Sequence, residues 1–407
     1  MKPGYKQTEV GVIPEDWEVQ SLGNIASLKN GYAFKSSTYD SLGAFKVVTI
    51  ANVQDGRMDL SECNKIRTIP QDLQHHQRLK NGDILISMTG NVGRVCRVSE
   101  VDCLLNQRVG KLVPLKVADR FLFAALLQRK FLSAMSEKAT GGAQGNLSKS
   151  DIEDHLFAIP PTLAEQEAIA GALSDADALI DSLEQLIAKK RLLKQGSMQD
   201  LLTGKKRLPG FEGEWEVKKL GEVTETDPEN LGSDTRRDYE FNYIALEDVD
   251  RGTLASFTPL RFADAPSRAR RKLRPADVVV STVRPNLQSH LLFTQDQGNW
   301  VCSTGFCVVR CREGLTHPWF VFNLMFSGIV NRQIDVLLTG SNYPAINSSD
   351  VRGLEIPCPS YAEQTAIAAI LSDMDAEIAA LEAKLAKARQ VKQGMMQELL
   401  TGKTRLV

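Results

Sequence analysis

The sequence predicts an α/β protein built as a tandem repeat of two globular domains and two long helices. The chain has 407 residues, which is more than one ordinary hydrophobic core accommodates. A helical segment occurs twice, and strand-like patterns of similar order precede both copies. The composition, 43% hydrophobic and 24% charged, is that of globular proteins and excludes wholesale disorder.

The repeat is clearest in two segments that align without a gap. They are AEQEAIAGALSDADALIDSLEQLIAKKRLLKQGSMQDLLTGKKRL from Ala164 and AEQTAIAAILSDMDAEIAALEAKLAKARQVKQGMMQELLTGKTRL from Ala362. Roughly two-thirds of their positions are identical, and the same offset maps Trp17 in WEVQSLG onto Trp215 in WEVKKLG. The stretches between these anchors diverge. We therefore expect a first variable domain over residues 1–158, a helical region over 159–208, a second variable domain over 209–355 and a second helical region over 356–407.

Each fixed segment is predicted to form one long helix. It follows a proline-rich stop, carries Glu in its first turn and is filled with strong helix formers. Apolar residues recur at alternating steps of four and three, which is the pattern of a coiled-coil seam. This seam consists of Ile169, Leu173, Ile180, Leu183 and Ile187 in the first copy, and Ile367, Leu371, Met374, Ile378, Leu381 and Leu385 in the second. We expect the two helices to pair as an antiparallel intramolecular coiled coil with pseudo-twofold symmetry; the alternative is that each stripe packs on its own globular domain.

The variable domains combine short strand patterns with buried helical patterns. FKVVTIANV and GDILIS in the first domain correspond to FNYIAL and DVVVS in the second, and turn residues bound each run. RFLFAALLQRKFLSAMSEKA and HPWFVFNLMFSGIVNRQIDVLL are typical of buried helices near the end of each domain. These patterns predict one compact α/β domain, present twice.

Polar and basic side chains concentrate in the predicted turns of both domains. Asn, Gln, Arg and Ser read base edges in the major groove, and Arg and Lys also hold phosphates. The alternative is that these loops are simply solvated and that RARRKLR, from Arg268, is an exposed charge run. The candidates for DNA contact are Thr89, Asn91, Arg94, Asn106, Gln107, Arg108, Gln144, Asn146 and Lys149 in the first domain, and Arg268, Arg270, Arg271, Lys272, Arg284, Asn286, Gln288, Asn342 and Tyr343 in the second.

The overall charge balance and the cysteines narrow the class of protein. The 49 basic residues are matched by 50 acidic ones, so nucleic-acid binding would rest on local patches. The seven cysteines show no CxxC pair and no zinc spacing, which indicates buried thiols, no metal site and a reducing cytoplasm. The N-terminus lacks an apolar signal region, and the apolar stretch 121–127 is too short to span a membrane.

Catalytic motifs are absent from the sequence. There is no GxSxG and no HExxH, nor the FxGxG and (D/N)PP(Y/F) pair that would bind S-adenosylmethionine and present a base. A binding protein therefore fits the sequence better than an enzyme does.

The segments KQTEVGVIPEDWEV, IPPTLAEQEAIAGALSDADALIDSLE and KQGSMQDLLTGKKRL resemble the specificity subunits of type I restriction-modification systems. The resemblance covers essentially the whole chain and is most specific in the two helical repeats. It implies that each variable domain reads one half of a bipartite, asymmetric double-stranded DNA site, and that the helices space the halves and dock methylation subunits, two per chain. Restriction subunits would complete the complex. The resemblance also implies no cofactor in this chain, with S-adenosylmethionine, ATP and Mg²⁺ in the partner subunits.

Two other functions remain open from the sequence. The first is a coiled-coil scaffold whose two heads bind proteins. The second is an enzyme whose site carries no recognised motif. Two heads that read DNA would meet half-sites about one helical turn, roughly 34 Å, apart.

Overall fold

The computed structural model describes residues 3–139, 145–338 and 344–406. The chain divides into two compact units, one formed by residues 1–183 with 384–407 and the other by residues 184–383. Each unit holds a globular head and a segment of both long helices, α5 (Leu163–Leu202) and α10 (Tyr361–Leu399). We call the part before α5 the first head and the part between α5 and α10 the second head. No helix in the described part of the chain has an apolar stretch of membrane-spanning length.

The first head is built on two sheets. The four-stranded sheet is antiparallel and has the order β4 (Ala26–Asn30), β10 (Val109–Pro114), β7 (Ile84–Ser87), β8 (Val95–Arg97). The three-stranded sheet has the order β6 (Asn64–Ile66), β5 (Phe45–Val48), β9 (Cys103–Leu105), and β5 runs parallel to β9. All four side chains of β7 are buried, which explains why this strand has no polar alternation.

Smaller elements complete the first head. The helices are α1 (Leu22–Ile25), α2 (Asp119–Leu126), α3 (Arg129–Lys138) and α4 (Lys149–Glu153). Two strand pairs are β1 (Tyr5–Thr8) with β2 (Gly11–Pro14), and β3 (Glu18–Ser21) with β11 (Leu156–Ile159). Buried residues of α2 and α3, such as Phe121 and Phe131, share one core with Ile86 of β7.

The second head repeats this topology. Its antiparallel sheet has the order β13 (Thr224–Thr226), β22 (Phe306–Cys311), β19 (Val278–Ser281), β20 (Leu291–Leu292). Its other four-stranded sheet has the order β17 (Thr258–Arg261), β14 (Glu240–Ile244), β21 (Trp300–Ser303), β18 (Ala269–Leu273), with β14 parallel to β21. The remaining elements are α6 (Leu220–Val223), α7 (Pro318–Met325), α8 (Gly328–Leu337), α9 (Ser348–Gly353), the pair β12 (Glu216–Lys219) with β23 (Glu355–Cys358), and the pair β15 (Val249–Asp250) with β16 (Thr253–Leu254). The prediction of one α/β fold present twice is confirmed.

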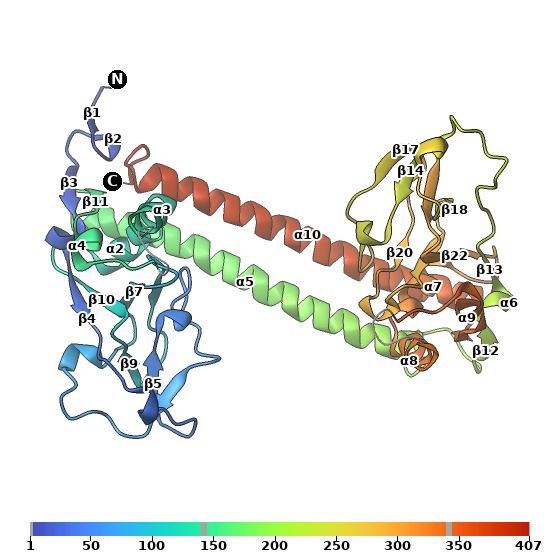
Figure 1. The fold of residues 1–407 in the computed structure, drawn as a ribbon, viewed down its shortest axis with the longest axis horizontal. Coiled ribbons are helices and arrows are strands. Elements are labelled where there is room, and N and C mark those ends of the chain that lie inside the picture. The colour runs from blue at the N-terminus through green and yellow to red at the C-terminus, as the bar shows by residue number, and fades with distance from the viewer. Residues whose placement is uncertain (1–2, 140–144, 339–343, 407) are drawn as a thin grey trace. The chain divides into compact units, whose positions relative to one another are not determined.

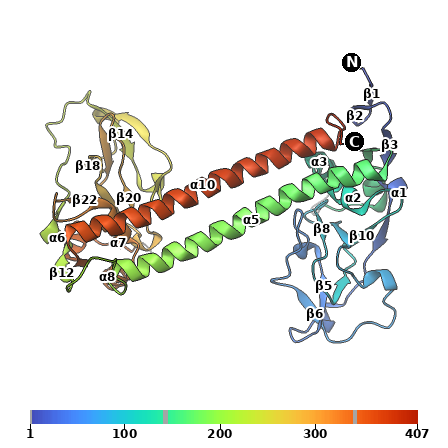
Figure 2. The same ribbon diagram turned by 180° about the vertical axis from the view of Figure 1, so that it is seen from behind.

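The two long helices lie side by side in both views (Figure 1, Figure 2). In the first unit Asp177 of α5 pairs with Lys392 of α10 at 2.5 Å. In the second unit Lys190 pairs with Glu377 at 2.6 Å, and Arg191 with Glu382 at 2.6 Å. Since exposed ion pairs are worth at most about 1 kcal/mol, these contacts set direction and register more than stability.

Some residues of the predicted coiled-coil seam pack on the partner helix, and others pack on the adjacent head. Ile169 and Leu173, near the start of α5, belong to the core of the first head, and Ile367 and Leu371 of α10 belong to that of the second. Further along, Leu183, Ile187 and Ile378 are buried, whereas Ile180, Met374, Leu381 and Leu385 are half-buried. The antiparallel coiled coil is confirmed. The first turns of each apolar stripe pack on the head instead, as the alternative interpretation predicts.

A buried carboxylate at the start of α10 joins three parts of the second unit. Glu363, whose side chain is 2% exposed, accepts hydrogen bonds from Arg207 Nε at 2.7 Å and Nη2 at 2.8 Å, and from Trp215 Nε1 at 3.1 Å. The neighbouring Gln364 accepts the His317 N–H at 2.9 Å and donates to the carbonyl oxygen of Pro359 at 2.9 Å. This clamp ties the end of α5, the start of α10 and the second head together.

The same clamp recurs in the first unit with the C-terminal arginine. Arg405 forms an ion pair with the buried Glu165 at the start of α5 and hydrogen bonds of 2.9 and 3.0 Å with Asp16. Its guanidinium also lies 5.8 Å from the ring centre of Trp17. These contacts explain why AEQ, LLTGK and the Trp are the repeated residues.

Gly402 makes the close approach in this clamp possible. It has a φ of +70°, and a Cβ atom there would lie 2.5 Å from Pro14 Cδ. Gly204, at the equivalent position in the second unit, has a φ of +69° and lies against Trp215. Glycine is therefore required after each long helix for both its backbone conformation and its small size.

His290 is a fully buried imidazole in the core of the second head. Its Nδ1 accepts the Ser281 N–H at 3.1 Å, its Nε2 has no hydrogen-bond partner among the described residues, and its ring lies edge-on to Phe326 at 5.4 Å. Burial disfavours the imidazolium and lowers the pKa of His290 to about 4. The histidine is therefore neutral in the folded protein near pH 7.

We expect Arg207→Ala to destabilise the second unit by about 3 kcal/mol, because it leaves the buried Glu363 carboxylate without its cation. Arg207→Met combined with Glu363→Gln removes both charges and should cost less. Arg236→Ala, which breaks the exposed pair with Asp238, is the control and should leave the urea midpoint unchanged. Urea unfolding of the three variants measures this, and equal midpoint shifts for Arg207→Ala and Arg236→Ala would refute the clamp.

We expect acid to destabilise the second head through His290. Below pH 6.5 the unfolded chain binds a proton at this residue, whereas the folded chain does not until about pH 4. The free energy of unfolding should fall across this window by up to about 3 kcal/mol and be unaffected by His290 above it. His290→Asn keeps an acceptor for Ser281 and should flatten the dependence in urea titrations at pH 7 and pH 5. Equal pH dependence in both proteins would contradict this assignment.

Candidate nucleic-acid interface

The turn after β7 in the first head contacts a second loop. Residues 88–93 form this turn, and Thr89 pairs with Asn146 as an isolated β-bridge. The Thr89 hydroxyl donates to Asn146 Oδ1 at 2.9 Å, and the Gly90 N–H donates to the Gly145 carbonyl oxygen at 2.9 Å. The structure thus brings together two candidate residues that are far apart in the sequence.

The loop that leads into β10 lies beside the same turn. The Met88 N–H donates to the Arg108 carbonyl oxygen at 3.0 Å, and the side chains of Asn91, Gln107 and Arg108 are exposed. Asn106 is different, because it is buried and its Oδ1 accepts the Arg108 N–H at 3.3 Å. Asn106 therefore shapes the loop, while its neighbours face solvent.

The second head has an equivalent pair of loops after β19. The Arg284 N–H donates to the Pro344 carbonyl oxygen at 2.8 Å, and Val283 forms an isolated β-bridge with Ala345. Asn286, in the same turn, is exposed. Since β7 and β19 hold the same position in their sheets, both heads present a turn and a second loop at the same place in the fold.

Two candidate residues of this second turn have unusual backbone conformations. Arg284 has a φ of 50° and Gln288 a φ of 57°, a left-handed region that side chains other than glycine and asparagine rarely adopt. Gln288 Oε1 accepts a hydrogen bond from Arg251 Nη2 at 2.8 Å, which holds the turn. Backbone strain of this kind concentrates at functional sites, and so it favours a role for this turn in recognition.

Other candidates are held in place or fall outside the described chain. Arg94 is half-buried and donates from Nη1 to Gln54 Oε1 at 2.7 Å, and Lys149 pairs with Glu153 along α4 at 3.5 Å. The remaining candidates, Gln144, Asn342 and Tyr343, lie outside the described residues.

The basic run of the second head forms β18, and most of its charge is used inside the protein. Arg271 pairs with Asp227 at 2.8 Å, and Lys272 lies 3.7 Å from Glu229. Arg270 packs its guanidinium 5.0 Å from the ring centre of Phe262, whereas Arg268 is exposed. Arg271 and Lys272, which the sequence offers as candidates for DNA contact, thus already have acidic partners within the protein.

An arginine of β22 extends this ion-pair network. Arg310 binds Asp277 at 2.8 Å and Glu229 at 2.7 Å, and Arg274 also pairs with Glu229. The hydrogen bond from Arg310 lowers the pKa of Glu229, so this carboxylate stays charged at neutral pH. The network joins four basic and three acidic side chains and is a structural element of the second head.

The described residues hold no group of His, Cys, Asp and Glu side chains arranged as a metal site. The cysteines are free thiols, and burial raises the pKa of Cys96 and of Cys307 to about 12. Thiols with such high pKa values are poor nucleophiles and poor metal ligands.

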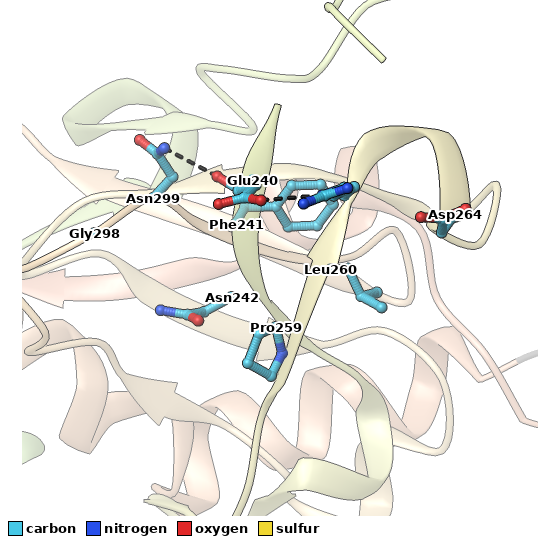
Figure 3. Close-up of a pocket in the computed structure, with 9 residues that line it drawn as sticks. Glu240, Phe241, Asn242, Pro259, Leu260, Asp264, Gly298 and Asn299 are labelled. Carbon is cyan, nitrogen blue, oxygen red and sulfur yellow. Dashed lines mark hydrogen bonds and ion pairs between the residues drawn. The ribbon is translucent and has the colours of Figure 1, made fainter. Parts of the chain in front are cut away.

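A cavity of about 610 Å³ lies along β14 and β17 in the second head (Figure 3). Of its two carboxylates, Glu240 and Asp264, Glu240 pairs with Arg261 at 3.0 Å, and Asn299 donates to the Glu240 carbonyl oxygen at 3.0 Å. Pro259 occupies the edge strand. These contacts resemble a satisfied sheet edge more than a site that activates a substrate.

Sequence reasoning missed a basic groove on the first head. Lys29, Arg78 and Lys80 line it, and they come from separate parts of the chain. An alignment of HHQRLK (residues 75–80) with ARRKLR (residues 269–274) could have revealed these residues. That alignment depends on the turn before β7 and β19, which only the structure shows.

The comparisons with known proteins agree with this architecture. A family model described as the type I restriction modification DNA specificity domain matches residues 14–190 and again residues 212–390. Each match spans one head and most of the helix that follows it.

Relatives and solved structures span the whole chain. The putative type I restriction enzyme MjaX specificity subunit of Methanocaldococcus jannaschii is 24% identical over 99% of this chain and 97% of its own length. The MjaVIII specificity subunit of the same organism is 25% identical, with 97% and 94% covered. The crystal structure of the type I restriction-modification S subunit from M. genitalium shares the fold, with a TM-score of 0.60, 16% identity, and 98% and 99% covered. The chain therefore belongs to the family of type I restriction-modification DNA specificity subunits.

Proposed function

We propose that this chain is the DNA sequence-recognition subunit of a type I restriction-modification complex in the cytoplasm. Each head reads one half of a bipartite, asymmetric site. The observation that carries the proposal is the repeated head, in which the same fold presents an equivalent turn and second loop bearing different side chains: Asn91 and Asn146 in the first head, and Arg284 and Asn286 in the second. Two relatives that span the chain are named specificity subunits, which supports the proposal.

The mechanism divides between positioning and reading. Basic side chains that hold phosphates fix the register of a head on the duplex, and polar side chains in the loops distinguish base edges in the groove. The rigid sheets behind the loops hold these side chains in place, which limits the ordering cost of binding. Because the two heads carry different loop residues, the proposed target is asymmetric even though the fold is duplicated.

In this proposal the chain itself is not catalytic and carries no cofactor. Methyl transfer would use S-adenosylmethionine bound to methylation subunits, two per chain, and DNA translocation and cleavage would use ATP and Mg²⁺ bound to restriction subunits. This chain determines the DNA sequence at which both reactions are directed.

The helices provide a surface on which methylation subunits dock. In the second unit, Leu186 and Leu193 of α5 lie seven residues apart and are 38% and 50% exposed. Leucines in that spacing form a continuous stripe outside the seam to α10. An exposed apolar stripe on a long helix is typical of a protein–protein contact.

We expect Asn91→Ala to alter only one half-site, and Asn286→Ala, in the corresponding turn of the second head, to alter only the other. Loss of one base-reading contact costs about 1–3 kcal/mol of discrimination. Each variant is expressed with its methylation partner, and the methylated sites are mapped by sequencing genomic DNA. A change in both half-sites from one substitution would contradict independent heads. If the wild-type complex shows no sequence-dependent methylation or binding, a protein-binding scaffold becomes the better description.

We expect Leu186→Glu with Leu193→Glu to weaken binding of the methylation subunit at least about tenfold, because charges would replace apolar contacts. Val217→Glu, at another exposed apolar position (68% exposed), serves as the control. Calorimetric titration with the purified partner measures both affinities. If both variants bind as tightly as the wild type, the stripe is not the docking surface.

A further inference from the structure

A groove of about 470 Å³ on the first head is lined by basic side chains from separate elements. Lys29 comes from β4, Lys111 from β10 and Arg97 from β8, while His75, Arg78 and Lys80 come from the segment before β7. The acidic residues that line it are Asp83 and Asp119. Such a concentration of positive charge is unexpected in a chain whose formal net charge is −1.

The acidic residues neutralise only part of this charge. Lys111 pairs with Asp83 at 2.6 Å, and Arg97 pairs with Asp119 at 2.6 Å. Within the described residues, Lys29, Arg78 and Lys80 form no ion pair. Three cationic side chains that line one groove without a counter-charge form a surface for an anion.

The second head can be compared with the first residue by residue, because the same turn precedes β7 and β19 and aligns the two segments. Asp83 Oδ2 accepts the Lys80 N–H at 2.7 Å, and Asp277 Oδ2 accepts the Arg274 N–H at 2.7 Å. In each head the central strand, β7 or β19, begins at the next residue. Lys80 therefore corresponds to Arg274, and Arg78 corresponds to Lys272.

The sheet register fixes the other side of the groove. Leu112 and Val309 occupy the same position, because each pairs with the first residue of the central strand. Their partners on the outer strand are Leu28 and Thr226, so the next residues, Lys29 and Asp227, also correspond. A lysine on the first head thus occupies the position of an aspartate on the second.

This exchange of sign changes the character of the surface. On the second head, Asp227 pairs with Arg271, and Glu229 pairs with Lys272 and Arg274, so each of these cations has an acidic partner. On the first head, Lys29 replaces the aspartate and Gly31 stands two residues later, where the second head has Glu229. The same part of the fold is therefore an ion-pair network in which each cation has an acidic partner on one head and, within the described residues, a groove with three unpaired cations on the other.

We propose that this groove binds the phosphodiester backbone of DNA beside the half-site that the first head reads. The inference rests on the proposed function, and it adds that the phosphate contacts of the two heads are unequal. A duplex backbone is a regular row of anions and suits a groove with several separate cations. The corresponding surface of the second head makes no such contact, because its cations are already paired.

The test compares two matched double variants in the complex with the methylation subunit. Arg78→Gln with Lys80→Gln removes the groove's cations, and Lys272→Gln with Arg274→Gln changes the corresponding pair on the second head. Fluorescence anisotropy gives Kd at several KCl concentrations for a duplex carrying the mapped site and for an unrelated duplex. The first variant should reduce the slope of log Kd against log salt by about 2 and weaken binding to both duplexes roughly tenfold or more, while the mapped sequence stays the same. The second variant should leave the slope unchanged.

The outcomes separate this inference from the proposed function. If the wild-type complex binds its site specifically but the first variant keeps the wild-type slope, the groove does not hold phosphates and the inference is overturned. Equal slope changes in both variants would also overturn it. If the first variant instead loses the methylation subunit with its salt slope intact, the groove binds an acidic protein surface and DNA is excluded. Lys29→Asp, which installs the residue of the second head, should reproduce the reduced slope in a protein with an unchanged thermal midpoint.

Discussion

The buried pairing of a first-turn glutamate with an arginine from the end of the other long helix is the constraint on which each unit depends. Glu165 and Glu363 are both 2% exposed, and a carboxylate buried to this degree is stable only with a cation and full hydrogen bonding. Arg405 and Arg207 provide both through paired N–H donors. The start of one helix therefore has to meet the end of the other.

That requirement explains the pattern of the duplicated residues. The clamp joins the helices, and the adjacent Gln166 fastens α5 to its head by accepting the Ala118 N–H at 2.8 Å and donating to the Pro160 carbonyl oxygen at 2.9 Å. The AEQ motif, the TGK turn and the arginine after it form one structural device, so they recur together. The clamp contacts named above involve no residue of the turn after β7 or after β19, so the clamp does not restrict the side chains of those turns.

The sequence predicted the helices well because their information is local. Helix formers, a proline stop and a 4–3 apolar spacing act within one segment, and α5 and α10 run over the expected residues. Glu165 was interpreted only as a favourable charge at a helix start, since its partner Arg405 is far away in the sequence. Pairing of that kind becomes visible only when the chain folds back on itself.

The candidate site was less predictable, and the reason is electrostatic. RARRKLR has the composition of a phosphate-binding run, but Asp227 and Glu229, in the segment after β13, pair with its Arg271, Lys272 and Arg274. HHQRLK carries less charge and is not among the predicted DNA-contact residues. The strand beside it, however, bears Lys29 at the position where the second head has Asp227. The composition of a segment gives the number of its charged side chains. The electrostatic potential at the surface also depends on which other segments lie beside it in the fold. Loop residues such as Asn91 and Asn286 were found because turn chemistry is local, but their placement beside a second loop was not.

A duplicated fold that carries unequal surfaces has a physical consequence for recognition. If both heads bound phosphates equally well, the nonspecific attraction to DNA would be the same in both orientations of the protein. Only mismatched bases would then disfavour the reversed orientation on an asymmetric site. With cations unpaired among the described residues in the groove of the first head and an ion-pair network on the second, the proposed backbone contact would be stronger at the first head. Phosphate contacts carry no sequence information themselves, but under this proposal unequal contacts would favour binding through the first head before the second head reads its half-site. Differences of charge at corresponding positions can therefore divide the work of binding between two heads without changing the fold that both share.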